Sequence, residues 1–72
     1  MNQKDKIIEY LSTKGFATVR DLVIKLNINS PTKRISELMY AGYPISKSWE
    51  TRTNKDGETK RFIMYHWMGE RL

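Results

Sequence analysis

Few side chains in this 72-residue chain could do covalent chemistry, and their types argue against catalysis. There is no cysteine, and the single histidine, His66, leaves any metal cage to carboxylates alone. A nucleophile paired with a general base is hard to build from this set. The four glycines stand apart from one another, so no glycine-rich loop can cradle a phosphate. We therefore expect no enzyme, no metal and no cofactor.

Basic residues give the chain its clearest chemical character. Thirteen lysines and arginines stand against 8 acidic residues, and the formal charge is +5. The excess is spread along the chain and does not form a basic tail. Such a balance favours a polyanionic partner, so the elements that position these cations decide what they can bind.

The first segment predicts a helix between Asn2 and Gly15. Asn2 can cap its start, Asp5 suits the positive first turn, and Gly15 supplies the left-handed residue that ends many helices. The apolar face of this helix contains Ile7, Ile8 and Leu11.

A second, short helix is predicted to follow. Thr18 is placed as its N-cap, and Asp21 three residues later completes a capping box. Apolar residues then recur at i, i+3, i+4 and i+7, the spacing of a buried helical stripe. These residues are Val19, Leu22, Val23 and Leu26.

A third helix is predicted over residues 31–41, after Ile28 has filled the corner. Ser30 as N-cap with Pro31 at the first helical position is a strong start signal, and Gly42 marks the end. Two helices with so short a connection form a helix-turn-helix unit. The third helix should bury Ile35, Leu38 and Met39 and expose Lys33, Ser36, Glu37 and Tyr40.

After Pro44 the periodicity changes to 2, which predicts strands over residues 45–53 and 58–68. Asp56-Gly57 between them is a strong hairpin signal. A two-residue loop would pair Trp49 with Met64, and a four-residue loop would pair Trp49 with Phe62, so the register stays open. Both versions place the same side chains together: Ile45, Trp49, Phe62 and Met64 toward the helices, and Arg52 and Arg61 outward.

Three helices followed by a two-stranded antiparallel hairpin form an α+β winged helix-turn-helix, expected here as a single domain over residues 1–72. A hairpin alone is marginal in water, and a helical core of this length is thin. Each part therefore needs the apolar face of the other.

Two motifs, Ile-Ser-Glu-Leu at 35–38 and Gly-Tyr-Pro-Ile at 42–45, carry a resemblance together with the Ser-Pro start at 30–31. The chain resembles small winged helix-turn-helix proteins encoded by bacteriophages, prophages and related mobile elements. With the hairpin Trp49 and the Asp56-Gly57 turn, the similarity covers nearly the whole chain. It implies DNA binding through the third helix, with the hairpin as the wing.

One difference from that group predicts a modest affinity for each subunit. Members commonly carry Arg or Lys just after the Glu-Leu pair, where this chain has Met39 and Tyr40. The helix that reads DNA therefore has less positive charge.

Helix-turn-helix docking places the N-terminal part of the third helix in the major groove. The candidate base-reading residues are Thr32, Lys33, Ser36 and Tyr40. The candidate phosphate contacts are Arg20, Ser30, Arg34, Arg52, Lys55, Lys60 and Arg61. Glu37 should accept from a cytosine amino group or orient Arg34 or Lys33. The alternative is a solvated surface, on which Lys33 pairs with Glu37, and Glu50 and Glu58 neutralise the wing.

The aromatic residues of the hairpin allow two interpretations. Exposed rings could stack on single-stranded bases, but alternation favours packing in the core for Trp49 and Phe62. Ile63, Tyr65 and Trp67 are expected on the outer face, where such a patch marks a partner surface. We expect a homodimer or a partner protein at this patch.

The expected function is the regulation of transcription on double-stranded DNA of a phage or mobile element. Two alternatives remain open: an excisionase-like architectural factor that bends DNA for recombination, and a winged-helix module that binds protein. No apolar run approaches the roughly 18 residues of a membrane span, and no secretory signal follows Met1. We expect a cytoplasmic location in a bacterial or phage-infected host cell.

Overall fold

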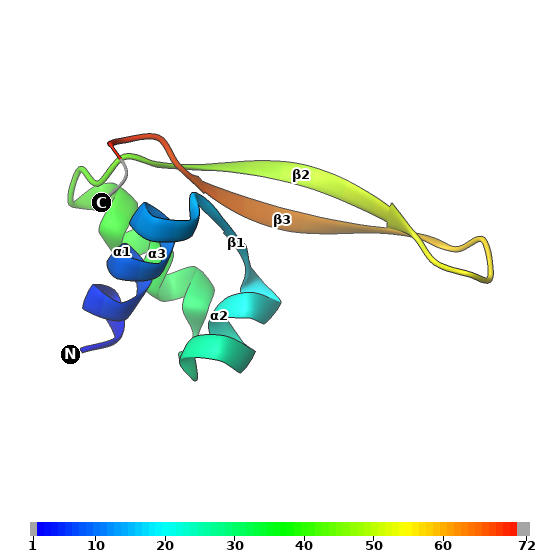
Figure 1. The fold of residues 1–72 in the computed structure, drawn as a ribbon, viewed down its shortest axis with the longest axis horizontal. Helices are drawn as coiled ribbons and strands as arrows, with labels where there is room; N and C mark the ends of the chain where they lie inside the picture. Colours follow the sequence, from blue (N-terminus) through cyan, green and yellow to red (C-terminus); the bar gives the residue numbers. More distant parts are fainter. Residues whose placement is uncertain (1, 71–72) are drawn as a thin grey trace.

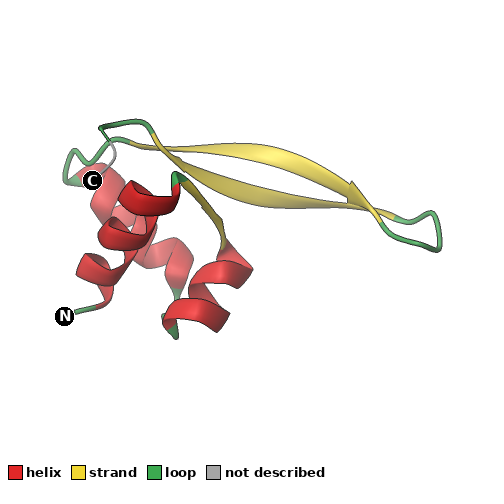
Figure 2. Ribbon diagram, in the orientation of Figure 1, coloured by secondary structure: helices red, strands yellow, loops and turns green. Residues whose placement is uncertain are grey.

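The computed structural model describes residues 2–70 as three helices and one antiparallel sheet. The elements in chain order are α1 (Gln3–Lys14), β1 (Phe16–Thr18), α2 (Val19–Leu26), α3 (Pro31–Tyr40), β2 (Ile45–Thr53) and β3 (Thr59–Trp67). The helices gather at one end of the sheet, and β2 and β3 extend well beyond them as a wing (Figure 1). Figure 2 shows the same division between a helical body and a projecting hairpin.

Local capping sets the ends of α1 and α2, as predicted. The side chain of Asn2 accepts a hydrogen bond from the backbone N–H of Asp5 at 2.8 Å, and Gly15 follows the last turn of α1 with φ of 93°. Thr18 and Asp21 exchange side-chain and backbone hydrogen bonds of 3.1 Å each. These contacts span three residues, so the local sequence is sufficient to specify them.

The start of α3 is partly different from the prediction. Pro31 is the first helical residue, but Ser30 has φ of 52° and its side chain makes no capping hydrogen bond. An N-cap side chain reaches the amides from extended backbone, and the left-handed conformation does not provide that geometry. Asn27 is also left-handed, with φ of 55°, so two such residues turn the chain between α2 and α3. The helix ends at Tyr40, one residue before the predicted end.

The sheet has three strands, and the predicted two-stranded hairpin is corrected accordingly. Strand β1 pairs with β3, with Ala17 opposite Tyr65, and the strand order is β1-β3-β2. Ala17 is fully buried. A strand of only three residues is too short to show a period of 2 in the sequence, so β1 was not predicted.

Neither predicted hairpin register is right, because the loop contains five residues, 54–58. The Asn54 side chain accepts hydrogen bonds from the N–H groups of Asp56 and Glu58, at 3.0 Å each, and this holds the longer loop. Trp49 therefore pairs with Ile63. A shift of one residue reverses the face of every β3 side chain relative to β2.

The reversal changes which hairpin residues face the helices. Ile45 is buried as predicted, and Phe62 and Met64 lie on the opposite sheet face. Trp49 shares the face of Ile45 but is 59% exposed, because the wing extends beyond the helices there (Figure 1). Tyr65, only 2% exposed, belongs to the core, and Ile63 and Trp67 pack against it. The partner surface predicted at Ile63, Tyr65 and Trp67 is therefore wrong, because these side chains cover the helices.

The core lies where the three helices meet the base of the sheet. Ile28 fills the corner between α2 and α3 as predicted and is 2% exposed. Val23 and Met39 were predicted inward but lie at the margins of their helices, 45% and 37% exposed. The buried hydrophobic residues are Ile7, Leu11, Ala17, Leu22, Ile28, Ile35, Leu38, Ile45 and Tyr65.

Candidate nucleic-acid interface

One face of α3 combines the four predicted base-reading side chains. Ile35 and Leu38 are 1% and 2% exposed, so they fix the inward face of the helix. The helical period places the side chains opposite them together, and all four are exposed. They are Thr32, Lys33, Ser36 and Tyr40. Tyr40 is 96% exposed, so its ring projects from the end of this face.

Arg34 and Glu37 lie on the flank of α3 that faces α1. Arg34 Nη1 is 3.2 Å from Glu37 Oε1, and Lys4 Nζ is 3.7 Å from the same oxygen. The contacts are electrostatic and not aligned hydrogen bonds, because Glu37 Oε1 has no hydrogen-bond partner among residues 2–70. Glu37 thus orients Arg34, one of the predicted options, and its second cation is Lys4 instead of Lys33. Arg34, a predicted phosphate contact, is thus already engaged by a carboxylate within the protein.

The other two predicted phosphate contacts of the helical body are accessible. Arg20 is exposed in the first turn of α2, and Ser30 is exposed immediately before α3. Arg20 thus lies at the end of α2 away from the α2–α3 connection, and Ser30 is the last residue of that connection.

The basic side chains of the wing are exposed, but their arrangement differs from the prediction. Arg52 and Arg61 were expected together on the outward face, whereas Arg52 lies opposite Lys60 and Arg61 lies opposite Thr51. Arg52 and Lys60 therefore share one sheet face, and Arg61 lies on the other. Lys55 is exposed in the loop at the tip.

Each face of the wing pairs an arginine with an aromatic ring, which the sequence analysis missed. The guanidinium carbon of Arg61 is 4.7 Å from the centroid of Trp49, and that of Arg52 is 5.6 Å from the centroid of Phe62. Both distances are in the range of cation–π contacts. The signal that could have found them is Asn54, whose amide-capping ability indicates a longer loop and hence the observed register.

The cations of the wing are not neutralised by carboxylates within the described chain. Every ion pair found among residues 2–70 lies in the helical body. Glu50 instead accepts a hydrogen bond from Ser48 at 3.2 Å. The alternative in which Glu50 and Glu58 neutralise the wing is therefore not the arrangement observed.

Among the described side chains, Ser48 and His66 form the contact that most resembles a catalytic pair. Ser48 Oγ is 3.0 Å from His66 Nε2, and its hydroxyl donates to Glu50. Because the hydroxyl proton of Ser48 points at Glu50, the imidazole of His66 donates its N–H to the Ser48 oxygen. A general base would instead accept the hydroxyl proton. Within residues 2–70, no three His, Asp or Glu side chains are grouped as metal ligands would be.

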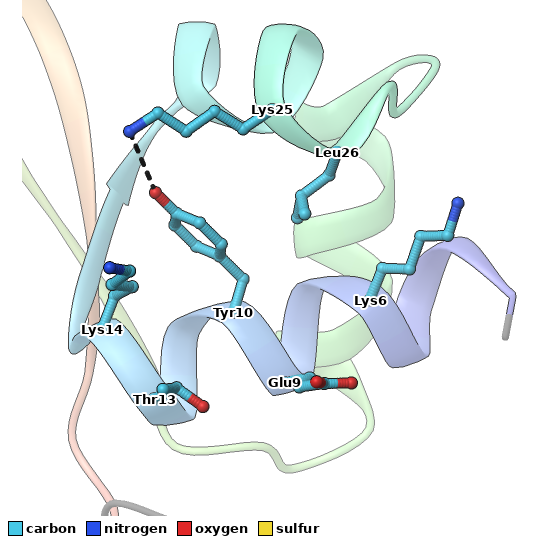
Figure 3. Close-up of a pocket in the computed structure, with 7 residues that line it drawn as sticks. All are labelled: Lys6, Glu9, Tyr10, Thr13, Lys14, Lys25 and Leu26. Atoms are coloured by element: carbon cyan, nitrogen blue, oxygen red, sulfur yellow. Dashed lines mark hydrogen bonds between the residues drawn. The ribbon is translucent and has the colours of Figure 1, made fainter.

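A shallow hollow of about 400 Å³ separates α1 from α2 (Figure 3). Lys6 and Lys14 from α1 line it, and Lys25 from α2 reaches across with Nζ 3.4 Å from the hydroxyl of Tyr10. Lys25 also lies 3.8 Å from Asp21, which reduces the net charge of the hollow. None of the predicted DNA contacts lines it.

No helix within residues 2–70 is both long enough and apolar enough to span a membrane. The longest, α1, has 12 residues and contains charged as well as apolar side chains.

Comparison with protein-family models identifies the family of this chain. The family model described as the winged helix-turn-helix domain matches residues 2–70. Searches of curated proteins and of solved structures found no significant match. Domains of this kind typically bind DNA and are not enzymes. The match spans nearly the whole sequence, and the three helices with a projecting β2–β3 wing have the arrangement that this description requires. The chain therefore belongs to the winged helix-turn-helix domain family.

Proposed function

We propose that this protein binds double-stranded DNA with α3 in the major groove and the β2–β3 wing on neighbouring phosphates. The observation that carries the proposal is the exposed face of α3, where hydroxyl, ammonium and phenol groups stand opposite the buried Ile35 and Leu38. These groups can donate to or accept from base edges. In this assignment the base-reading residues are Thr32, Lys33, Ser36 and Tyr40.

The wing supplies a second argument. Arg52 and Lys60 lie directly opposite each other, and like charges in that position destabilise a sheet. A phosphate between them would offset the repulsion. We assign phosphate contacts to Arg20, Ser30, Arg52, Lys55, Lys60 and Arg61, and only a minor contact to Arg34, because Glu37 engages it.

The biological role that we propose is transcriptional regulation in a bacteriophage or mobile element. This part rests on the resemblance carried by residues 30–45. An excisionase-like role requires strong bending of the bound duplex. Gel shifts of circularly permuted fragments distinguish the two, since a regulator of this kind leaves mobility independent of the position of the site.

Fluorescence anisotropy with a labelled duplex at several salt concentrations tests DNA binding. Because the preferred sequence is unknown, the duplex is first selected from a random library on the wild-type protein. We expect Lys60→Ala to reduce the magnitude of the salt slope by roughly 0.9, the amount for one phosphate. Lys33→Ala or Ser36→Ala should reduce the preference for the selected sequence over random duplex.

Lys14→Ala is the matched control, since it removes an equally exposed lysine from the far end of α1. An identical loss for Lys14→Ala and Lys60→Ala would show that only net charge matters. Absence of binding at low salt would contradict the proposal as a whole.

A further inference from the structure

Trp49 is an unusual residue to find in solvent. It lies on the same sheet face as Ile45 and Tyr65, which are 7% and 2% exposed, yet its own side chain is 59% exposed. The wing extends beyond the helices, so the face that covers the core at its base becomes accessible further along (Figure 1). The exposed indole is therefore on the inner side of the wing, the side that continues from the helical body.

Arg61 orders this indole. Its guanidinium lies over the Trp49 ring at 4.7 Å, on the strand opposite, one residue pair further toward the tip on the same face. The cation covers one side of the ring, and the Trp49 side chain is still 59% exposed. A ring held in this way loses little conformational freedom when a second flat group stacks on it.

The charges on the inner face identify the kind of partner. From Lys47 to Thr53 on β2, and from Thr59 to Ile63 on β3, the inner positions carry cations but no carboxylate. The nearest acidic side chain on β2, Glu50, lies on the other face and is engaged by Ser48. A flat aromatic group joined to an anion fits this surface, and a nucleotide has both parts.

We propose that Trp49 and Arg61 form a stacking platform for an unpaired DNA base, with the phosphate of that nucleotide near Arg61. The wing thereby favours duplexes that contain unpaired nucleotides, such as a bulge or a frayed end, over fully paired duplex. The inference rests on the DNA binding proposed above and adds to it the structural class of the target. It also reverses the expectation of core packing for Trp49, because the wing carries this residue beyond the helices.

The test compares one duplex with the same duplex carrying a short bulge. Wild-type protein should bind the bulged form more tightly, and Trp49→Ala should lower the affinity for it by roughly 5- to 150-fold, the range for loss of one base–aromatic stack. Affinity for the fully paired duplex should stay unchanged. Trp49→Phe keeps a stacking ring and should retain part of the preference.

Phe16→Ala is the matched control, because Phe16 is a similarly exposed aromatic, at 52%, on the opposite sheet face. It should leave both affinities unchanged. In a Trp67→Phe background Trp49 is the only indole, so bulged DNA should quench its fluorescence more than paired DNA does.

Three results would overturn the inference. The first is equal affinity of the wild type for both DNA forms, and the second is a bulge preference that survives in Trp49→Ala. The third is a dimer of the wild-type protein that sedimentation detects without DNA and that is absent in Trp49→Ala. Trp49 would then bind a second copy of the chain and not a base. If the wild-type protein binds paired duplex but does not prefer the bulged form, the inference fails and the proposed function still holds. If it binds neither DNA form, the proposed function fails as well.

Discussion

Arg34 and Glu37 form an ion pair on the flank of α3, with Arg34 Nη1 3.2 Å from Glu37 Oε1. The carboxylate also attracts Lys4 at 3.7 Å, so it holds two cations next to the surface proposed to face DNA. Glu37→Gln should free both and raise the affinity for duplex DNA. The salt slope should steepen by roughly 0.9 for each additional phosphate contacted. Anisotropy titrations over a range of salt concentrations measure this.

The control for that prediction is Glu9→Gln, which changes net charge by the same amount from an exposed position on α1. An equal gain in both variants would show that Glu37 has no local effect. The stability of the fold should hardly change with Glu9→Gln, because Glu9 is exposed. Glu37 is half-buried, so urea unfolding of Glu37→Gln is measured alongside the titrations.

Tyr65 and Trp49 should differ sharply in their contribution to stability. Tyr65 is 2% exposed opposite Ala17, and Tyr65→Ala should lower the free energy of unfolding by about 3–5 kcal/mol, as for other buried aromatic truncations. Trp49→Ala removes an exposed ring and its contact with Arg61, and should cost about 1 kcal/mol or less. Urea unfolding followed by circular dichroism compares them. Equal losses would mean that Trp49 lies in the core after all.

The helices could be predicted from the sequence because their determinants are local. Asn2, Thr18 and Asp21 act on groups three residues away, and the helical period alone places Ser36 and Tyr40 opposite Leu38. The exposed face of α3 follows directly from this. The main departure is the left-handed Ser30, since the sharp connection after α2 imposes a backbone conformation that a capping signal does not reveal. Val23 and Met39, predicted inward, are exposed at the margins of their helices.

The wing could not be predicted to the same depth because its pairing is non-local. The basic residues themselves were recognised, but the face of each depends on the number of residues in the loop. The Asn54 side chain accepts hydrogen bonds from two backbone N–H groups and so holds a loop of five residues. The observed register differs by one residue from each of the two predicted ones. One consequence is that Tyr65 is buried on the face that covers the helices, the opposite of the expectation. Trp49 keeps its predicted face and is exposed because the wing extends beyond the helices.

Ser30 and Thr18 precede helices but should respond differently to mutation. Thr18→Ala removes a real cap and should cost about 1 kcal/mol in free energy of unfolding. Ser30 makes no capping hydrogen bond and has φ of 52°, so Ser30→Gly should relieve left-handed strain and stabilise the fold by about 0.5–1 kcal/mol, after the greater entropy of unfolded glycine is subtracted. Thermal unfolding of the two variants measures both effects. Destabilisation by Ser30→Gly would indicate that the Ser30 side chain caps α3 in solution.

Asp21 should make part of the stability of α2 dependent on pH. The backbone N–H of Thr18 donates to Asp21 Oδ2 at 3.1 Å and is the main reason that the pKa of this carboxyl lies below its ordinary value, with a smaller contribution from Lys25. A carboxyl with a lower pKa in the folded state binds fewer protons there than in the unfolded chain. Its contribution is therefore complete above the unfolded pKa of about 3.9 and is lost as the pH falls through the folded pKa.

Asp21→Asn should accordingly lower the free energy of unfolding at pH 7 and have a smaller effect at pH 3, as measured by urea unfolding at both values. Asp5→Asn is the control, because Asp5 also lies in the first turn of a helix but lacks the reciprocal contact that Asp21 makes with its N-cap. It should lower the free energy of unfolding at pH 7 by less than Asp21→Asn does. If the two substitutions changed stability equally at both pH values, the effect would belong to the helix dipole in general and not to the Thr18–Asp21 capping box.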